Sequence, residues 1–364
     1  MGWSTQVITK SKERIDPNVR VVIMSYTMMT LKAEARETVW DCMIADECHY
    51  LSSPDARRSR MAALIPASKV MMLSGTPFLN RPAELWHILY MLYPNAYPNK
   101  YTFWKKYCDG HIETIYRRDG AVRFYDKSGI SKQNIPDLKN KLSKFMVRRL
   151  KQEVLSQLPE LRRSVIKVDV DNQYSDLIKQ IRESRKTDRA TALTKLAELR
   201  KLIGAQKVVP TVELAENILH GGEKVVIYAH HKDVVTDLKN RLMEYGVDTI
   251  VGDNSSEERQ ATIQKFQNEE TPRVLIISSA GGEGINLFAS SNLIFAEREW
   301  NPGKETQIEG RVHRVGQTKG VMVYYLVARG GVDERIHNLI ERKRETVGEI
   351  MTMPEIETDI LEVI

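Results

Sequence analysis

The chain has 364 residues, of which 42% are hydrophobic and 28% charged, with a formal net charge of +6. This length predicts two domains, with cores of roughly 150–200 residues each. The basic balance favours contact with a polyanion such as nucleic acid, although many basic proteins bind none. Three cysteines without a C-x-x-C pair exclude a disulfide scaffold. No apolar stretch has the length of a membrane span, so we expect a soluble, intracellular protein, cytoplasmic in a prokaryote or virus and nuclear in a eukaryote.

Short apolar runs alternate with amphipathic segments in the front part of the chain, as is typical of parallel α/β architecture. Strands are predicted at residues 19–25, 40–45 and 70–73. From 82 to 158 the periodicity is mostly helical, interrupted at 108–130 by a hairpin or a loop. We therefore expect a first lobe over residues 1–158, with a helical insertion from about residue 82.

The rear part repeats the alternation after a second helical region at about 173–219. Strands are predicted at residues 224–229, 249–251, 274–278, 293–296 and 321–327. The helix after the first of them carries an apolar face formed by Val234, Val235, Leu238, Leu242 and Tyr245. This pattern predicts a second α/β lobe over residues 159–364, with the crossing between lobes at 159–164.

Two carboxylates follow the apolar strand predicted at 40–45, in the tetrapeptide Asp46-Glu47-Cys48-His49. Open α/β sheets bind ligands at the carboxyl edge of their strands. Hydrolysis of a nucleotide γ-phosphate needs one carboxylate for the Mg²⁺ shell and another group to orient the attacking water. Asp46 and Glu47 suit these roles in that order. The alternative is an exposed pair of acids that ends a strand.

The next predicted strand leads into Ser74-Gly75-Thr76-Pro77. Small hydroxyl residues and glycine let the backbone approach another group closely, and proline stops the strand. Alone this is a turn. After the acidic motif it becomes a candidate loop that couples the nucleotide to nucleic acid.

A glycine-rich segment follows the strand predicted at 274–278, with Gly281, Gly282 and Gly284 in the run from Ala280 to Leu287. Three glycines so close together predict a loop whose amides face a phosphate of ATP or of a nucleic-acid backbone. Elsewhere in the rear lobe, the adjacent histidines His230 and His231 have no partner at ligand spacing and predict no structural metal.

The strongest motif runs from Gln307 to Gln317 and contains Gly310, Arg311 and Arg314. On a helix, Gln307, Arg311 and Arg314 would lie on nearly one face. Planar guanidinium groups can stabilise the charge that develops on a transferring phosphoryl group. The alternative is a solvated basic helix face.

In these motifs the sequence resembles the Swi/Snf family of helicase-like, double-stranded-DNA translocases of superfamily two. The resemblance covers residues 19–335 and includes the D-E-x-H box, S-G-T-P, A-G-G-x-G-I-N-L and Q-x-x-G-R-x-x-R-x-G-Q. Phe145 to Lys151 and Trp300-Asn301-Pro302 are more particular to this family. Other stretches look most like the branch of annealing helicases.

The resemblance implies two RecA-like lobes, ATP and Mg²⁺ as cofactors, and duplex or branched DNA as partner. It makes Asp46 the residue that serves Mg²⁺ through the nucleotide, Glu47 the activator of water, and Arg311 and Arg314 the arginine fingers. It assigns ATP binding and coupling to His49, Gly284, Gln307 and Gly310. It assigns DNA contact and coupling to Ser74, Gly75, Thr76, Gly281 and Gly282.

The sequence departs from the family at one point, because it contains no G-x-x-x-x-G-K-S/T run to hold the phosphates. We therefore expect an incomplete first lobe. Three hypotheses stay open: an ATP-dependent translocase whose phosphate-binding loop comes from a separate chain, an inactive remnant that binds DNA or a partner, and an incomplete reading frame.

Overall fold

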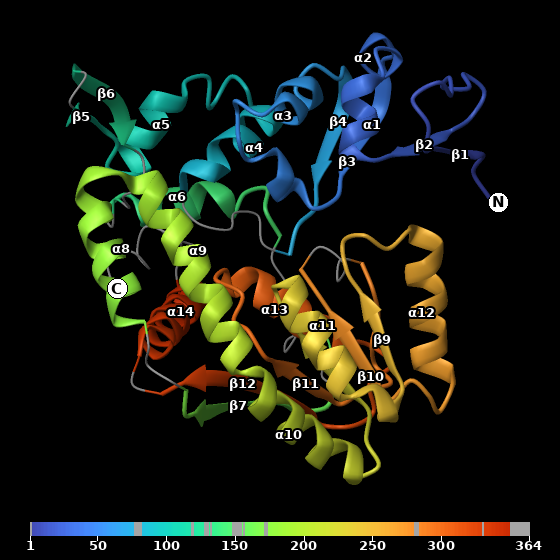
Figure 1. Cartoon of the computed structure of the whole chain (residues 1–364). Coiled ribbons are helices and arrows are strands. Elements are labelled where there is room, and N and C mark those ends of the chain that lie inside the picture. Colours follow the sequence, from blue (N-terminus) through green and yellow to red (C-terminus); the bar gives the residue numbers. More distant parts are fainter. Residues whose placement is uncertain are drawn as a thin grey trace. The chain divides into compact units, whose positions relative to one another are not determined.

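The computed structural model describes residues 2–75, 82–117, 120–126, 131, 133–147, 155, 157–170, 174–279, 284–329 and 331–349. The fold is α/β, as expected, with parallel sheets and many helices (Figure 1). The chain divides into two compact units, whose main bodies are residues 1–146 (unit 1) and 147–348 (unit 2).

Unit 1 begins with two separate parallel strand pairs. The pairs are β1 (Thr5–Ile8) with β2 (Val21–Met24), and β3 (Trp40–Ala45) with β4 (Ala67–Met72). Short helices accompany them: α1 (Tyr26–Leu31), α2 (Glu34–Glu37), the 3₁₀ turn η1 (Cys48–Leu51) and α3 (Arg57–Ala62). The three strands predicted here are confirmed, whereas the polar four-residue strand β1 was not predicted.

The rest of unit 1 is mainly helical, as predicted. It contains the 3₁₀ turn η2 (Pro82–Glu84), α4 (Leu85–Leu92), α5 (Lys100–Tyr107) and α6 (Ile135–Leu142). Aromatic side chains of α4 and α5, among them Trp86, Phe103 and Trp104, form its core with Leu138 of α6. The segment expected to be a hairpin or a loop is an antiparallel hairpin of β5 (His111–Arg117) and β6 (Gly120–Asp126).

Unit 2 is built on a six-stranded sheet of order β7-β12-β11-β8-β10-β9 in which every pair is parallel. The strands are β7 (Leu161–Val168), β8 (Val225–Tyr228), β9 (Val247–Ile250), β10 (Val274–Ile277), β11 (Asn292–Phe295) and β12 (Val321–Ala328). The five strands predicted in this region are confirmed. All four residues of β8, β10 and β11 are buried, as expected for the centre of a parallel sheet.

The edge strand β7 differs from the prediction, which placed a crossing between lobes at residues 159–164. From Leu161 onward the chain pairs with β12, beginning at Val321. Half of the β7 positions are exposed, and Arg162, Arg163 and Lys167 give it a polar sequence. Because an edge strand is only half buried, it lacks the continuous apolar run by which the central strands were recognised.

Helices cover both faces of the sheet (Figure 1). α10 (Val208–His220) and α11 (Lys232–Arg241) pack on one face, while α12 (Ser256–Asn268) and α13 (Pro302–Val312) pack on the other. The remaining elements are α8 (Ser175–Thr187), α9 (Arg189–Gln206), the 3₁₀ turn η3 (Met243–Tyr245) and α14 (Val332–Glu349). The predicted apolar face is confirmed for Val234, Val235 and Leu238, which are buried in the core. Leu242 and Tyr245 pack against the same core, but they lie beyond the end of α11.

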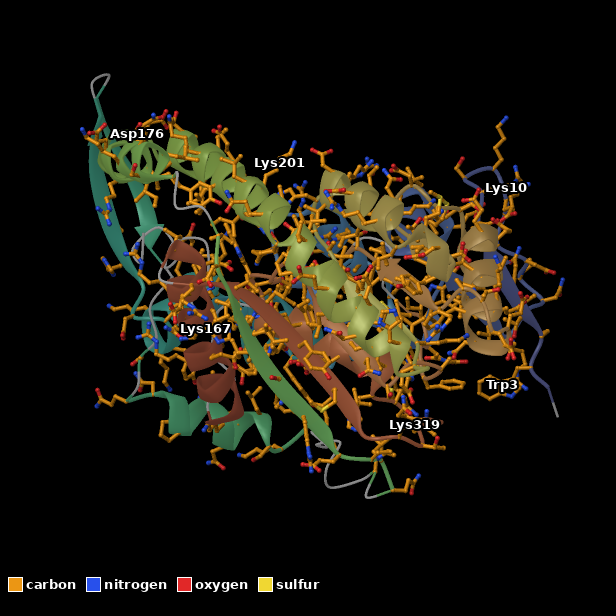
Figure 2. The ribbon with its side chains drawn as sticks, turned by 60° about the horizontal axis from the view of Figure 1, so that its bottom comes forward. Trp3, Lys10, Lys167, Asp176, Lys201 and Lys319 are labelled. Carbon is orange, nitrogen blue, oxygen red and sulfur yellow. The ribbon has the colours of Figure 1, made fainter. Side chains whose placement is uncertain are left out.

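Charged side chains surround this core (Figure 2), and several form ion pairs on the surface. Lys167, Lys201 and Lys319 lie 2.5, 2.6 and 2.7 Å from carboxylate oxygens of Glu334, Asp233 and Glu223. Exposed pairs of this kind each contribute about 0–1 kcal/mol. The stability of unit 2 therefore comes mainly from its two apolar layers.

Truncation of a core residue should show this directly. Phe266 of α12 is fully buried against the sheet, so Phe266→Ala should lower the free energy of unfolding by about 3–5 kcal/mol in urea denaturation. Met243 is 70% exposed, and Met243→Ala should change it by less than about 0.5 kcal/mol. Equal losses from the two changes would contradict the packing described.

Candidate functional site

The acidic box stands at the carboxyl end of β3, as predicted. The chain turns sharply there, because Glu47 has a φ of 47°, which is uncommon for a residue with a side chain. The amide of Glu47 donates to Asp46 Oδ1 at 2.9 Å, and the Tyr26 hydroxyl donates to the Asp46 carbonyl at 2.6 Å. These bonds hold the turn, leaving Asp46 exposed and Glu47 partly exposed.

His49 lies between the acidic box and the serine of the next motif. Its Nδ1 is 3.2 Å from Glu47 Oε2 and 3.3 Å from Ser74 Oγ, and its ring is buried. The backbone joins the same two segments, because Cys48 N donates to the Leu73 carbonyl at 2.8 Å. The structure thus brings the two predicted motifs of unit 1 into contact.

Gly75 follows Ser74 at an exposed position. Thr76, which belongs to the same predicted motif, lies outside the described residues.

The arginine motif lies on α13 and just beyond it, in unit 2. Asn301 caps the helix by accepting from the amides of Gly303 and Lys304, and Pro302 occupies the first turn. Gln307, Gly310 and Arg311 lie on the helix as predicted. Arg314 does not, because α13 ends at Val312 and Arg314 is exposed in the turn that follows.

The end of the glycine-rich segment is bonded to this turn. Leu287 N donates to the Arg311 carbonyl at 2.8 Å, and Gln317 Nε2 donates to the carbonyls of Phe288 and Ser290 at 3.1 and 2.8 Å. A Cβ on Gly316, whose φ is 104°, would lie 3.4 Å from the Phe288 ring. The two predicted motifs of unit 2 therefore form one connected structure.

The glycines of that segment are described only in part. Gly284 has a φ of 73°, a conformation that favours glycine. Gly281 and Gly282 lie outside the described residues.

A topological switch point lies in unit 2 between the neighbouring strands β8 and β11. The helix after β8, α11, packs on one face of the sheet, and the helix after β11, α13, packs on the other. Open α/β sheets bind ligands in the crevice outside such strand ends. The residues in this position are His230 and His231 after β8, and those from Glu297 to Trp300 after β11.

Glu297 organises this crevice. Its carboxylate accepts from the amides of His230 and His231 at 2.7 and 2.9 Å, and it contacts His231 Nδ1 at 2.5 Å. Burial opposes ionisation of Glu297, but the hydrogen bonds from His231 outweigh it and lower its pKa. Burial, together with the charge of Arg200, lowers the pKa of His230 to about 4. His231 thus has a carboxylate partner that the sequence spacing did not reveal.

The buried face of α13 carries two acids that the sequence did not single out. Glu305 accepts from Arg298 at 2.7 Å through both carboxylate oxygens, and Glu309 accepts from Arg163 of β7 at 2.8 and 2.7 Å. The Tyr325 hydroxyl of β12 also donates to Glu309, at 2.5 Å. One feature of the sequence could have pointed to this charged cluster. The segment Glu297-Arg298-Glu299-Trp300 follows a buried strand, as the acidic box does.

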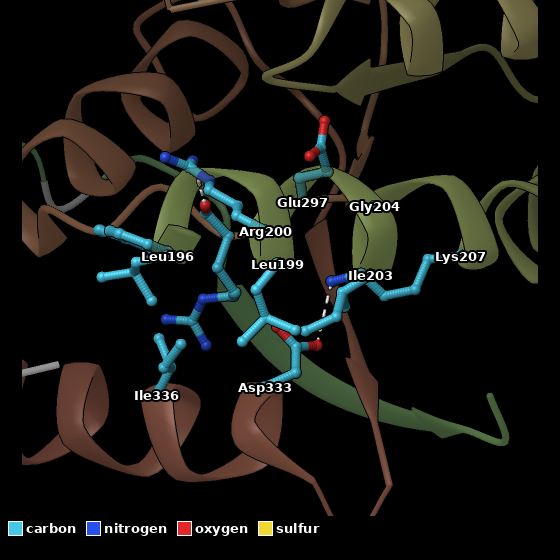
Figure 3. Close-up of a pocket in the computed structure, with 11 residues that line it drawn as sticks. Leu196, Leu199, Arg200, Ile203, Gly204, Lys207, Glu297, Asp333 and Ile336 are labelled. Atoms are coloured by element: carbon cyan, nitrogen blue, oxygen red, sulfur yellow. Dashed lines mark hydrogen bonds and ion pairs between the residues drawn. The ribbon is translucent and has the colours of Figure 1, made fainter. Parts of the chain in front are cut away.

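A pocket lies between α9, α14 and the end of β11 (Figure 3). Leu196, Leu199 and Ile203 of α9 form much of its wall. Its charged groups pair with other residues of the protein: Lys207 Nζ is 3.0 Å from Asp333 Oδ2, and the Arg200 guanidinium stacks over the Trp300 ring at 4.6 Å. This pocket is therefore an internal junction of unit 2.

Across the described residues, no group of three or more His, Cys, Asp or Glu side chains is placed to hold a metal ion. In the same part of the chain, no helix is both long enough and apolar enough to cross a membrane.

Two protein-family models match the chain. The SNF2-related domain matches residues 4–215, and the helicase conserved C-terminal domain matches residues 210–316.

Known proteins resemble the chain over most of its length. A SWI/SNF-related matrix-associated actin-dependent regulator of chromatin subfamily A-like protein 1 homolog of Caenorhabditis elegans is 33% identical, over 91% of this chain and 49% of that protein. The DNA annealing helicase and endonuclease ZRANB3 of Mus musculus is 31% identical, over 91% of this chain and 32% of that protein. The chain thus spans between about a third and a half of these relatives.

Among solved structures, the Sulfolobus solfataricus SWI2/SNF2 ATPase core in complex with dsDNA is similar to the chain. It is 22% identical with a TM-score of 0.46, and the match covers 96% of this chain and 76% of that one.

The environment of Cys48 gives a test of the acidic box. Burial and the charge of Glu47 raise the pKa of the Cys48 thiol to about 12, and the thiolate is the form that reacts with alkylating reagents. In the folded chain at about pH 8, iodoacetamide should label exposed Cys42 and spare buried Cys48 and Cys108. Peptide mass spectrometry reads the result.

Two controls accompany this labelling. Cys42→Ser should abolish labelling of the folded chain, whereas Cys48→Ser should leave it unchanged. Labelling of Cys48 as fast as Cys42 would contradict the described burial.

Proposed function

Because the chain belongs to the SNF2-related family, which the match to residues 4–215 shows, we propose that it is the core of an ATP-dependent DNA translocase that remodels duplex or branched DNA. The observation that carries the proposal is His49, which contacts both Glu47 and Ser74. A translocase must link nucleotide hydrolysis to its grip on DNA. A side chain shared by the acidic box and the S-G-T-P loop supports such a link.

The roles proposed for the acids follow from their positions. Mg²⁺ bound with ATP neutralises charge on the phosphates and prefers oxygen ligands. Asp46 offers an exposed carboxylate at the carboxyl end of β3 and would serve the metal through the nucleotide. Glu47 would orient the attacking water, and its carboxylate lies 3.2 Å from His49 Nδ1.

The roles proposed in unit 2 follow the same logic. Arg311 and Arg314 would stabilise charge on the transferring phosphoryl group. Gly284, Gln307 and Gly310 would take part in ATP binding and coupling. Ser74, Gly75, Thr76, Gly281 and Gly282 would contact the DNA backbone, so that binding depends on phosphates and not on base sequence.

We propose further that the phosphate-binding loop comes from outside these 364 residues, which contain no G-x-x-x-x-G-K-S/T run. The exposed surface of unit 1 is compatible with another segment packing there. Ile44 and Met71, partners across β3 and β4, are 61% and 50% exposed, and adjacent exposed apolar side chains are typical of contact surfaces. The alternative function is a DNA- or partner-binding protein without ATPase activity.

The first test is DNA-stimulated ATP hydrolysis by the purified chain, alone and with the product encoded immediately upstream. Glu47→Gln keeps the shape of the side chain but removes its charge, and it should lower kcat by about 10²–10⁴-fold. Asp41→Asn is the matched control, because Asp41 is an exposed acid on β3, the strand that leads into the acidic box. Equal rates in the two variants would refute the role of Glu47.

The different mixtures distinguish the hypotheses. Activity only with the upstream product supports a loop from a separate chain. Activity of the chain alone would refute that requirement, and no activity in any mixture would favour the binding protein.

A further inference from the structure

The last helix, α14, contributes charged side chains to the buried face of α13. Arg344 Nη2 donates to Glu305 Oε2 at 2.5 Å and to the Tyr325 hydroxyl at 2.9 Å, and Arg344 Nη1 donates to Glu309 Oε1 at 3.3 Å. Glu341 accepts from Arg298 Nη2 at 2.8 Å. Two residues of α14, three apart in the sequence, therefore hold both acids of α13 and the arginine that pairs with Glu305.

These contacts form one charge-balanced set. It contains the guanidinium groups of Arg163, Arg298 and Arg344 and the carboxylates of Glu305, Glu309 and Glu341. Glu305 is fully buried, and Arg298 and Glu309 are almost so. Buried charges are tolerated only when they are paired in good geometry. Removal of one member leaves its partners without compensation, so the set fixes relative positions more strictly than an apolar contact would.

α14 is anchored at its beginning as well. Asp333 accepts from Lys207 Nζ at 3.0 Å and from the Ala328 amide at 2.8 Å, which ties the first turn to the junction of α9 and α10 and to the end of β12. Ile336 of α14 lines the same pocket as Leu196 and Leu199 of α9 (Figure 3). The first turn of α14 is thus held in place, and the helix extends from there to Glu305 and Glu309.

Because α13 is held through its buried face, the position of its partly exposed face is set as well. Glu305 and Glu309 are four residues apart and lie on the buried face, while Gln307 and Arg311 are turned from them by roughly 200° and are partly exposed. A rigid helix held by one face presents the opposite face in a defined orientation. A shift of about 1 Å in such a group can cost on the order of 10²-fold in rate.

We propose that α14 is a positioning element for the arginine motif, in which Arg344 and Glu341 hold the acidic face of α13 and so set the place of Gln307 and Arg311. Neither α14 residue is assigned any contact with ATP, so both act through α13. The inference rests on the proposed function for its catalytic consequence, but the mechanical link between the two helices does not depend on it.

The test compares Arg344→Met with Arg342→Met. Arg342 lies on the same helix but is exposed, and its Nε donates to the Asn338 carbonyl of α14. Arg344→Met should lower the kcat of DNA-stimulated ATP hydrolysis by about tenfold or more, with KM for ATP changed less than about twofold. Arg342→Met should change neither constant.

Two further measurements keep the test decisive. Arg344→Lys keeps a positive charge, but the lysine cannot reach Glu305, Glu309 and Tyr325 together, so its kcat should be intermediate. This variant replaces Arg344→Met if circular dichroism shows that the methionine variant is unfolded. Amide hydrogen exchange should become faster in residues 302–312 of the Arg344 variants and stay unchanged in Arg342→Met.

The outcomes separate this inference from the proposed function. Faster exchange in α13 of the Arg344 variants, with no ATPase activity of the unaltered chain either alone or with the upstream product, would refute the proposed function and leave the link between helices standing. Unchanged exchange in α13 would overturn the inference. A fall in thermal stability with unchanged kcat would overturn it too, because α14 would then be only structural.

Discussion

The pairing of Arg298 with Glu305 is the interaction on which the arrangement of unit 2 depends. It joins the carboxyl end of β11 to the first turns of α13, and both residues are almost completely buried. The Arg298 guanidinium also stacks on the Tyr325 ring of β12 at 4.1 Å. Charges removed from water in this way are stable only together, so strand end and helix cannot separate independently.

Unit 1 brings its polar groups together in a related way, but with fewer side chains. Neighbouring parallel strands β3 and β4 end at the same edge, and the loops after them meet through His49. In both units, polar side chains gather where parallel strands end, because the helices that follow leave the edge open. The difference lies in burial: Asp46 stays exposed, whereas the acids of α13 are enclosed.

The sequence predicted those parts of the fold whose signal is local. β8 and β10 are continuous apolar runs, and β3 and β11 are apolar apart from Asp41 and Asn292. Their predicted bounds are within a residue or two of the structure. β7 was not predicted, because its exposed positions carry arginine and lysine. Motif order located the candidate site, but the burial of Arg298 could not be predicted, since Glu-Arg-Glu has the composition of a solvated surface. Besides Glu305, its partners Glu341 and Tyr325 come from distant elements that only the folded chain brings together.

The position of β7 also has a consequence for how the protein is made. β7 is the first strand of its sheet to leave the ribosome, yet its only neighbour among the described strands is β12, the last to be synthesised. Strands of such separation pair late, because a long loop must close before any contact forms. The central strands can assemble while β7 is still unpaired. The arginines and the lysine of β7 then disfavour pairing of this strand with other chains. The charges that kept β7 from being recognised as a strand in the sequence therefore also disfavour aggregation of the nascent chain.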